Sequence, residues 1–315
     1  MNTLIVCHAG AGMGLGHLTR SLVVARFLSQ ELGATVRFLI QGDPVQRPDL
    51  DLFEHQFLGN DGNLSDAIRQ QLLQVDTQLV VLDIHPHRLP QDVDDLLKTL
   101  RQDGRTVIAV DGLVNHRHNL DLIFIPALRF LPPDLAPGDP PILSGWDCFL
   151  LNVKQTPSEW KPGFRVLALA GGSDATALGE TWPTLLNETL PATTELQWVT
   201  GPYARQPVWP GQPRFLMVNH QAPAGLDDLM VGANYAVTVY GVSFYELLYY
   251  GVPTVVFSPY GDKDDAELAG ISEAGVALVA RDERDATEKL RQLMADDRLA
   301  SAISLRARQK MSVPG

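Results

Sequence analysis

The feature that most constrains this chain is the alternation of short, almost continuously apolar runs with segments of helical periodicity. In the first half the apolar runs cover residues 3–7, 35–40, 79–83, 106–111 and 122–126. In the second half they cover residues 165–170, 195–200, 214–219, 235–240, 254–259 and 276–281. Strands that are apolar on both faces are typical of parallel sheets covered by helices on each side. The sequence therefore predicts an α/β protein built on parallel sheets.

A proline-rich passage divides the chain near its middle. Helices are expected at residues 17–32 and 91–102, but between about 131 and 162 the periodicity stops and regular helix is not expected. We therefore predict an N-terminal Rossmann-like domain of residues 1–150 and a C-terminal one of residues 151–315. Two such domains would face each other across a cleft at the carboxyl ends of their strands, where open α/β sheets bind ligands.

The composition limits the classes of molecule that this chain is expected to bind. The chain has 25 basic and 37 acidic residues, a net charge of −12, which disfavours a broad surface for nucleic acid or anionic membrane. Cys7 and Cys148 fit neither a metal-ligand spacing nor a disulfide framework, so a reduced, cytoplasmic setting is expected. We expect no signal peptide and no transmembrane segment, although peripheral contact with a membrane stays open.

A glycine-rich loop, GAGMGLGHLTR, joins the first strand to the first helix. Glycines at such a place let the backbone approach an anionic ligand closely. The dinucleotide fingerprint fails on spacing, because the sixth position counted from Gly10 is Leu15 and from Gly12 is His17. This failure disfavours a nicotinamide oxidoreductase. The Gly-Lys-Ser/Thr of a P-loop is missing too.

His17 lies at the expected start of the first helix. There the helix dipole opposes protonation, which suits an imidazole that acts as a general base. The alternative is a histidine that only caps the helix or packs in the loop.

Two turns in the second half could each hold an anion at a helix start. The first is Gly171-Gly172-Ser173, followed by Asp174 or Thr176 as a helix cap, and alone it is a weak signal. The second is Gly241-Val242-Ser243 before a helix at residues 244–250, where backbone amides could meet a diphosphate. Glu246 could accept hydrogen bonds from both ribose hydroxyls, or could simply complement the helix dipole.

These motifs resemble those of a known group of enzymes. The string GMGLGHLTRSLVVARFL resembles the Gly-x-Gly-His-x-x-Arg loop of the MurG-like glycosyltransferase family 28 and of the related UDP-sugar hydrolases of pseudaminic acid synthesis. The turn GGSD and the pattern Gly-x-Ser, glutamate three residues later, then GVP are similar to the nucleotide site of the same enzymes. The resemblance covers residues 3 to about 280 and implies the GT-B fold.

The resemblance also implies roles for individual residues. It implies His17 and Asp83 as catalytic residues, Gly14, Gly16 and Arg20 as a phosphate or substrate loop, Gly171, Gly172, Ser173, Gly241, Val242, Ser243 and Glu246 as the nucleotide site, and Asp264 and Asp265 as contacts to the donor sugar. The family's glutamine beside these aspartates is absent here. Arg20 could instead be a solvated first-turn side chain. No cofactor and no metal are expected, and a metal site at Asp83, His85 and His87 is disfavoured by Pro86.

Two departures from the hydrolase pattern favour a transferase. Ile84 and His85 follow Asp83 where the hydrolases usually carry a nearby tyrosine, and Asp111-Gly112 replaces a pair of aspartates. We therefore predict a metal-independent, inverting glycosyltransferase with a nucleotide-sugar donor, UDP being the expected nucleotide, and a sugar, lipid-linked or small-molecule acceptor. The alternatives are a UDP-sugar hydrolase, a sugar-nucleotide 2-epimerase and a non-catalytic sensor. The apolar residues Phe130, Leu131, Trp146 and Trp160 could shape an acceptor site or pack between domains.

Overall fold

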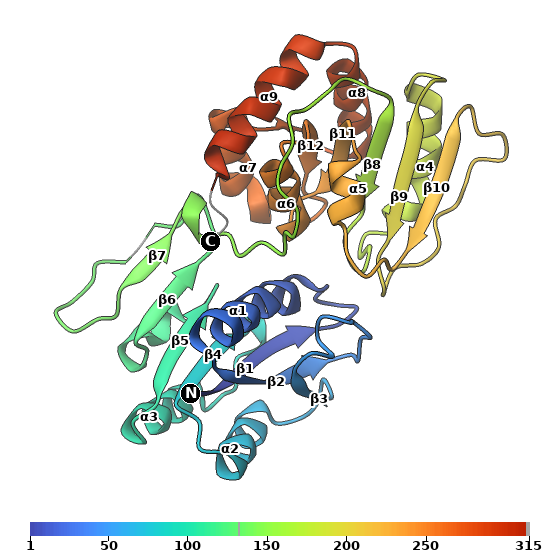
Figure 1. The fold of residues 1–315 in the computed structure, drawn as a ribbon. Helices are drawn as coiled ribbons and strands as arrows, with labels where there is room; N and C mark the ends of the chain where they lie inside the picture. The colour runs from blue at the N-terminus through green and yellow to red at the C-terminus, as the bar shows by residue number, and fades with distance from the viewer. Residues whose placement is uncertain (132, 313–315) are drawn as a thin grey trace. The chain divides into compact units, whose positions relative to one another are not determined.

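We describe the protein from a computed structural model that places residues 1–131 and 133–312. The chain divides into two compact units, Met1–Asn152 and a second that begins at Val153 (Figure 1). Each unit is built on its own parallel sheet, as the alternating pattern predicts.

The N-terminal unit contains a parallel sheet of order β3-β2-β1-β4-β5-β6-β7. Its strands are β1 (Asn2–Ala9), β2 (Thr35–Gly42), β3 (Glu54–Leu58), β4 (Leu79–Asp83), β5 (Thr106–Val110), β6 (Leu122–Ile125) and β7 (Ile142–Ser144). Its helices are α1 (Gly16–Leu32), α2 (Leu64–Gln74) and α3 (Val93–Gln102), with short 3-10 turns η1 (Pro86–Arg88), η2 (Val114–Asn119) and η3 (Trp146–Cys148).

Helices cover both faces of this sheet. Along β1, Leu4 and Val6 join the core that α2 and α3 close, whereas Ile5 and Cys7 join the core closed by α1. All four side chains are fully buried. This is why the central strands carry no polar alternation in the sequence.

The C-terminal unit contains a second parallel sheet, of order β10-β9-β8-β11-β12-β13. Its strands are β8 (Arg165–Leu169), β9 (Glu195–Thr200), β10 (Leu216–Gln221), β11 (Tyr235–Val239), β12 (Thr254–Phe257) and β13 (Leu278–Val279). Its helices are α4 (Leu178–Thr189), α5 (Asp227–Val231), α6 (Val242–Tyr250), α7 (Asp265–Ala274), α8 (Glu283–Met294) and α9 (Asp297–Lys310), with η4 (Gly261–Asp264) before α7.

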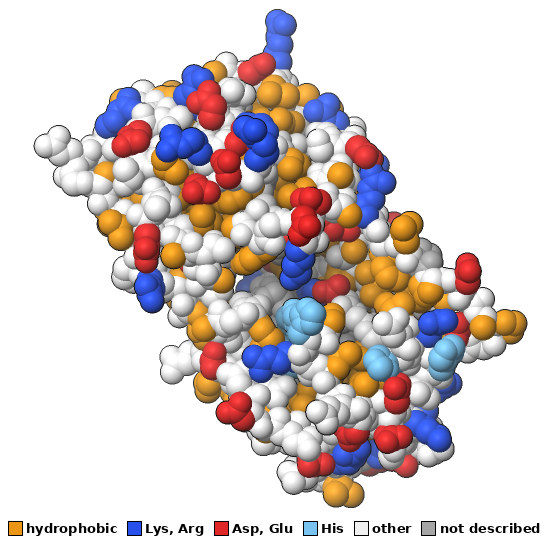
Figure 2. Space-filling view, turned by 180° about the vertical axis from the view of Figure 1, so that it is seen from behind, with side chains coloured by type: hydrophobic (Ala, Val, Ile, Leu, Met, Phe, Trp, Pro, Cys, Tyr) orange, Lys and Arg blue, Asp and Glu red, His pale blue; other side chains and the backbone are white. Residues whose placement is uncertain are grey.

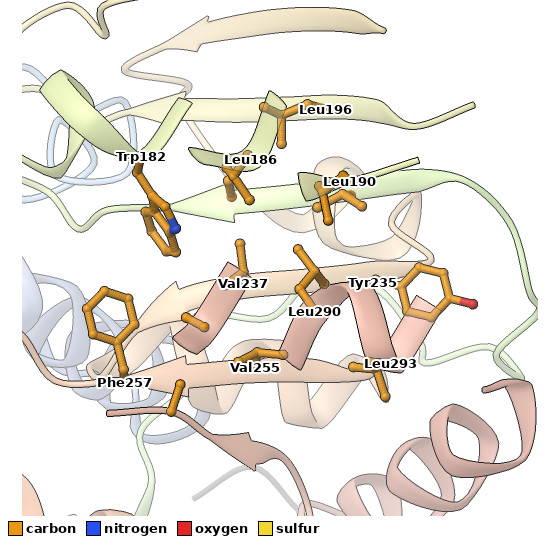
Figure 3. Close-up of a cluster of buried hydrophobic side chains, with 14 of the residues drawn as sticks. Trp182, Leu186, Leu190, Leu196, Tyr235, Val237, Val255, Phe257, Leu290 and Leu293 are labelled. Atoms are coloured by element: carbon orange, nitrogen blue, oxygen red, sulfur yellow. The ribbon is translucent and has the colours of Figure 1, made fainter. Parts of the chain in front are cut away.

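Aromatic packing anchors the main core of this unit. Trp182 of α4 is fully buried and meets the ring of Phe257 edge-on at a centroid distance of 5.3 Å (Figure 3). Its indole N–H donates to Thr287 Oγ1 at 3.0 Å. Leu290 and Leu293 of α8 pack into the same cluster. The core therefore ties α4 and α8 to the centre of the sheet.

Three strands show the largest differences from those that the apolar runs predict. β3 has no counterpart among them, because it is an edge strand whose residues Glu54, His55 and Gln56 are exposed. β7 lies within the proline-rich passage, pairs with β6 and belongs to the first sheet. β13 is only Leu278–Val279, much shorter than the predicted run at 276–281.

The surface gives little indication of which class of molecule the protein binds. No helix in the described residues is long and apolar enough to cross a membrane. On the face drawn in Figure 2, acidic and basic side chains are interspersed rather than gathered into one broad area.

We predict that Trp182→Ala lowers the free energy of unfolding of the C-terminal unit by about 3–5 kcal/mol, because the fully buried indole has no replacement in the core. The measurement is urea denaturation followed by circular dichroism. Leu305→Ala is the control, since Leu305 is 57% exposed and should change stability by less than about 0.5 kcal/mol. Equal stability of the two variants would contradict this assignment of the core.

Candidate functional site

Each sheet has one point where the strand order reverses. In the N-terminal unit it lies between β1 and β4, and in the C-terminal unit between β8 and β11. Ligands of open α/β sheets bind beyond the carboxyl ends of the strands at such a point. The glycine loop and the two glycine-containing turns of the C-terminal unit follow strands that flank these points, and Asp83 is the last residue of another such strand, β4.

Hydrogen bonds close the glycine loop on itself. Gly10 and Gly14 exchange backbone hydrogen bonds of 3.2 and 2.7 Å, and Gly14 has φ 70°, a conformation that favours glycine. The amide of Ala11 donates to Asp43 Oδ2 at 2.9 Å. α1 starts at Gly16 with no side-chain cap at Leu15, so no side chain caps its first amides.

Asp83, at the end of β4, is the centre of a buried polar cluster. Its side chain is fully buried and accepts two hydrogen bonds from Arg20, from Nε to Oδ2 and from Nη2 to Oδ1, both at 2.6 Å. His17 Nδ1 lies 2.6 Å from Asp83 Oδ1, and Ser21 Oγ lies 3.4 Å from Oδ2. The predicted catalytic pair His17 and Asp83 is therefore in direct contact.

These contacts fix the tautomer of His17. An ionised carboxylate only accepts hydrogen bonds, so the 2.6 Å contact requires the hydrogen on Nδ1 of His17. Arg20 Nη2 is 2.9 Å from the same nitrogen, but it can only donate and its hydrogen bond goes to Asp83. In a neutral ring, Nε2 is then the nitrogen with a lone pair for a proton.

Arg20 is buried, so the interpretation as a solvated side chain is wrong. Besides Asp83 it binds Asp111, whose Oδ2 lies 2.7 Å from Nη1. Asp111 directly follows β5 and has φ 57°, which turns the chain at that strand end. In the sequence, Asp111 stands out only as a departure from a family pattern, and no local signal predicts this contact.

Charge around the cluster sets two pKa values. Burial alone would raise the pKa of Asp83, but the guanidinium charge of Arg20 and the hydrogen bonds from Arg20 and His17 overcome it and lower the pKa to about 2. Burial also lowers the pKa of His8 to about 4, and the neighbouring His17 adds to that effect. At neutral pH Asp83 is therefore ionised, and His8, which accepts the N–H of His85 at 3.1 Å, is neutral.

The turn Gly241-Val242-Ser243 lies at the carboxyl end of β11. α6 begins at Val242, and its N-cap Gly241 offers no side chain, so neither a cap nor a first-turn acid occupies its amides. The structure thus leaves this helix start available to an anion. Glu246 lies one turn further along α6 and is 6% exposed, which leaves only a small part of its side chain accessible.

The turn Gly171-Gly172-Ser173 differs from it. Asp174 caps α4 with both carboxylate oxygens, accepting from the amides of Leu178 and Gly179 at 2.8 Å each, so a negative charge already occupies that helix start. The carbonyl of Gly172 accepts from the amide of Tyr203 at 3.1 Å. Of the two possible caps, Asp174 is the one observed.

Asp264 and Asp265 lie in different environments. Asp264 accepts from Ser258 Oγ at 2.5 Å and so lies at the carboxyl end of β12. Asp265 is the exposed first residue of α7. Only Asp264 is thus held against the strand ends where ligands of such sheets bind.

The apolar candidates of the sequence differ in their surroundings within each unit. Trp160 packs edge-on to Tyr235 and donates to the carbonyl of Asn234 at 2.7 Å, whereas Phe130 packs against the core of the N-terminal unit. Leu131 is 88% exposed. Within residues 1–131 and 133–312, no group of three His, Cys, Asp or Glu side chains is arranged to hold a metal ion.

Comparison with known proteins identifies the fold. No protein-family model and no curated protein sequence matches the chain. UGT2 of Phytolacca americana, complexed with UDP-2fluoro-glucose and pterostilbene, superposes with a TM-score of 0.66 at 13% identity, over 99% of this chain and 94% of that one. MurG of Acinetobacter baumannii gives 0.61 at 16% identity, over 98% and 94%. The spinosyn forosaminyltransferase SpnP gives 0.67 at 12% identity, over 99% and 95%. Identities this low speak for the fold alone, and the chain has the GT-B fold of two Rossmann-like parallel-sheet domains that its motifs predict.

Proposed function

We propose that the protein is a glycosyltransferase that moves a sugar from a nucleotide-sugar donor to an acceptor hydroxyl. The observation that carries the proposal is the 2.6 Å contact between His17 Nδ1 and Asp83 Oδ1, because it leaves Nε2 of a neutral His17 to take a proton. The fold supports it too, since solved proteins of the same fold include one complexed with UDP-2fluoro-glucose and one with thymidine diphosphate.

In the proposed reaction His17 is the general base. Its Nε2 takes the proton of the acceptor hydroxyl while that oxygen attacks the anomeric carbon, and the bond from that carbon to the diphosphate oxygen breaks. The electron pair of the broken bond stays with the nucleoside diphosphate. Attack from the face opposite the leaving group inverts the anomeric centre. Asp83, ionised at neutral pH, stabilises the imidazolium that forms.

The donor is proposed to bind mainly to the C-terminal unit. The uncapped start of α6 offers backbone amides to the diphosphate, which supports departure of the leaving group without a metal ion. Glu246 is proposed to bind the ribose, and Asp264 the donor sugar. Gly171, Gly172 and Ser173 would line the nucleotide site with their backbone. Gly14, Gly16 and the uncapped start of α1 would face the reacting groups, while Arg20 acts by holding Asp83.

We predict that Glu246→Gln weakens binding of UDP or TDP about tenfold or more, because charge-assisted hydrogen bonds to the ribose are lost. Isothermal titration calorimetry measures the affinity. Glu180→Gln is the matched control, since Glu180 is also an acid near a helix start in the same unit and its side chain is 52% exposed. Unchanged nucleotide affinity in the Glu246 variant would rule out its proposed role.

We predict that His17→Asn and Asp83→Asn each lower kcat by roughly 10² to 10⁴, the usual range for a positioned base, with little change in nucleotide affinity. The assay follows release of nucleoside diphosphate, and circular dichroism checks that the Asp83 variant folds. His116→Asn is the control, because His116 forms a comparable pair with Asp94 at 2.7 Å near the surface of the same unit. A His17 variant with the normal rate would return this residue to a purely structural role.

We predict that transfer to an acceptor is faster than hydrolysis of the donor, because the residues after Asp83 and at Asp111-Gly112 differ from the hydrolase pattern. The protein is incubated with a labelled sugar nucleotide, with and without cell extract as a source of acceptors, and labelled products are identified by mass spectrometry. Extract should raise the rate and yield a labelled conjugate. Free sugar formed at the same enzymatic rate with or without extract would instead identify a UDP-sugar hydrolase.

A further inference from the structure

A histidine-rich turn borders the reactive imidazole and has no part in the proposed reaction. Its residues His85, Pro86, His87 and Arg88 follow β4 after Ile84, and the last three form η1. The ring of His85 lies 5.7 Å from that of His17 and 5.3 Å from that of His87, measured between centroids. The turn is therefore an immediate neighbour of the proposed base.

Hydrogen bonds hold the backbone of this turn in place. The amide of His85 donates to Nδ1 of the fully buried, neutral His8 at 3.1 Å, and the amide of Arg88 donates to the carbonyl of His85 at 2.8 Å. The amide of His87 donates to Nδ1 of His85 at 3.2 Å. Nδ1 of His85 acts as an acceptor in this contact, which puts a single ring hydrogen on Nε2.

Arg88 gives this turn a positive charge. His87 and Arg88 are exposed, and no ion pair joins either of them to an acidic side chain within the described part of the chain. The acids nearest in sequence are already engaged, since Asp83 binds Arg20 and Asp92 binds Ser65 and Arg69.

Six other arginines of the unit contrast with Arg88, while the buried Arg37 hydrogen-bonds Gln71 and Thr77 instead of an acid. Arg20, Arg47, Arg69, Arg101, Arg105 and Arg117 each pair with at least one aspartate. In a chain of net charge −12, an arginine without such a partner beside two imidazoles suits a ligand that brings its own negative charge.

We propose that the turn His85–Arg88 binds an anionic group, a phosphate or a carboxylate, on the acceptor substrate. The proposal rests on the proposed glycosyltransferase function, in which the start of α6 already serves the diphosphate of the donor. An acceptor held by this turn has its charged group beside the base that deprotonates its hydroxyl. The enzyme would accordingly select anionic acceptors over neutral ones.

The first test is NMR of the imidazole groups in the full-length protein, titrated with inorganic phosphate, with acetate, and with sodium chloride at matched ionic strength. We expect saturable shifts of the His85 and His87 signals with phosphate or acetate, and the stronger of the two identifies the group. In Arg88→Gln the dissociation constant for that anion should rise about fivefold or more. His116 is the internal reference, and Arg298→Gln, at an exposed arginine of the other unit, is the control variant.

Two outcomes of this titration would overturn the proposal. Equal shifts with chloride would mean that the turn responds only to ionic strength. Displacement of the bound anion by UDP would assign the turn to the donor. Neither result bears on the nucleotide affinity of the Glu246 variant, so failure of this inference is distinguishable from failure of the proposed function.

The second test uses the labelled conjugates formed with cell extract. They should be retained by an anion-exchange column, and Arg88→Gln should raise the KM for the purified acceptor several-fold while donor KM changes little. A neutral conjugate as the main product would refute an anionic acceptor, and so would an unchanged acceptor KM.

Discussion

The ionised side chain of Asp83 has no contact with solvent, and the N-terminal half of the candidate site is arranged around it. A buried carboxylate is costly unless opposite charge and hydrogen bonds compensate for lost hydration. Arg20 supplies two hydrogen bonds of 2.6 Å and His17 a third contact of the same length. The site therefore depends on this one cluster.

The cluster also joins segments that are far apart in sequence. Arg20 reaches from the first turns of α1 to Asp83 at the end of β4 and to Asp111 after β5. Its guanidinium group thus connects the ends of the neighbouring strands β4 and β5, and its charge keeps Asp83 ionised beside His17. The loop motif implies Arg20 as a substrate contact, whereas its observed contacts are with Asp83 and Asp111.

The sequence predicts the parts of the fold that depend on local pattern. The buried run ending at Asp83 becomes β4 at its predicted residues, because a central parallel strand is apolar on both faces. The edge strand β3 could not be predicted in this way, since its exposed residues show no such pattern. β7 was missed because it is short and lies among prolines, and only its pairing with β6 makes it a strand.

For the candidate site, the spacing within a motif singles out candidate residues, but it does not predict their contacts. The loop motif singles out His17 and Arg20, yet the role of Asp111 follows from a turn with φ 57° and the reach of Arg20 across two strand ends. Such contacts between distant segments leave no local signal in the sequence. The pair His17 and Asp83 could be predicted only through resemblance.

The two glycine-containing turns of the C-terminal unit differ in whether a side chain already occupies the helix start. At α4, Asp174 places its carboxylate on the amides of Leu178 and Gly179, so a phosphate there would meet a negative charge. At α6, Gly241 has no side chain and the first turn has no acid. The positive end of the helix dipole therefore has no negative charge from the first turn beside it. Similar turns in sequence therefore differ in chemistry. We infer that the diphosphate belongs at α6, with Gly171 and Gly172 offering space for the nucleotide rather than charge.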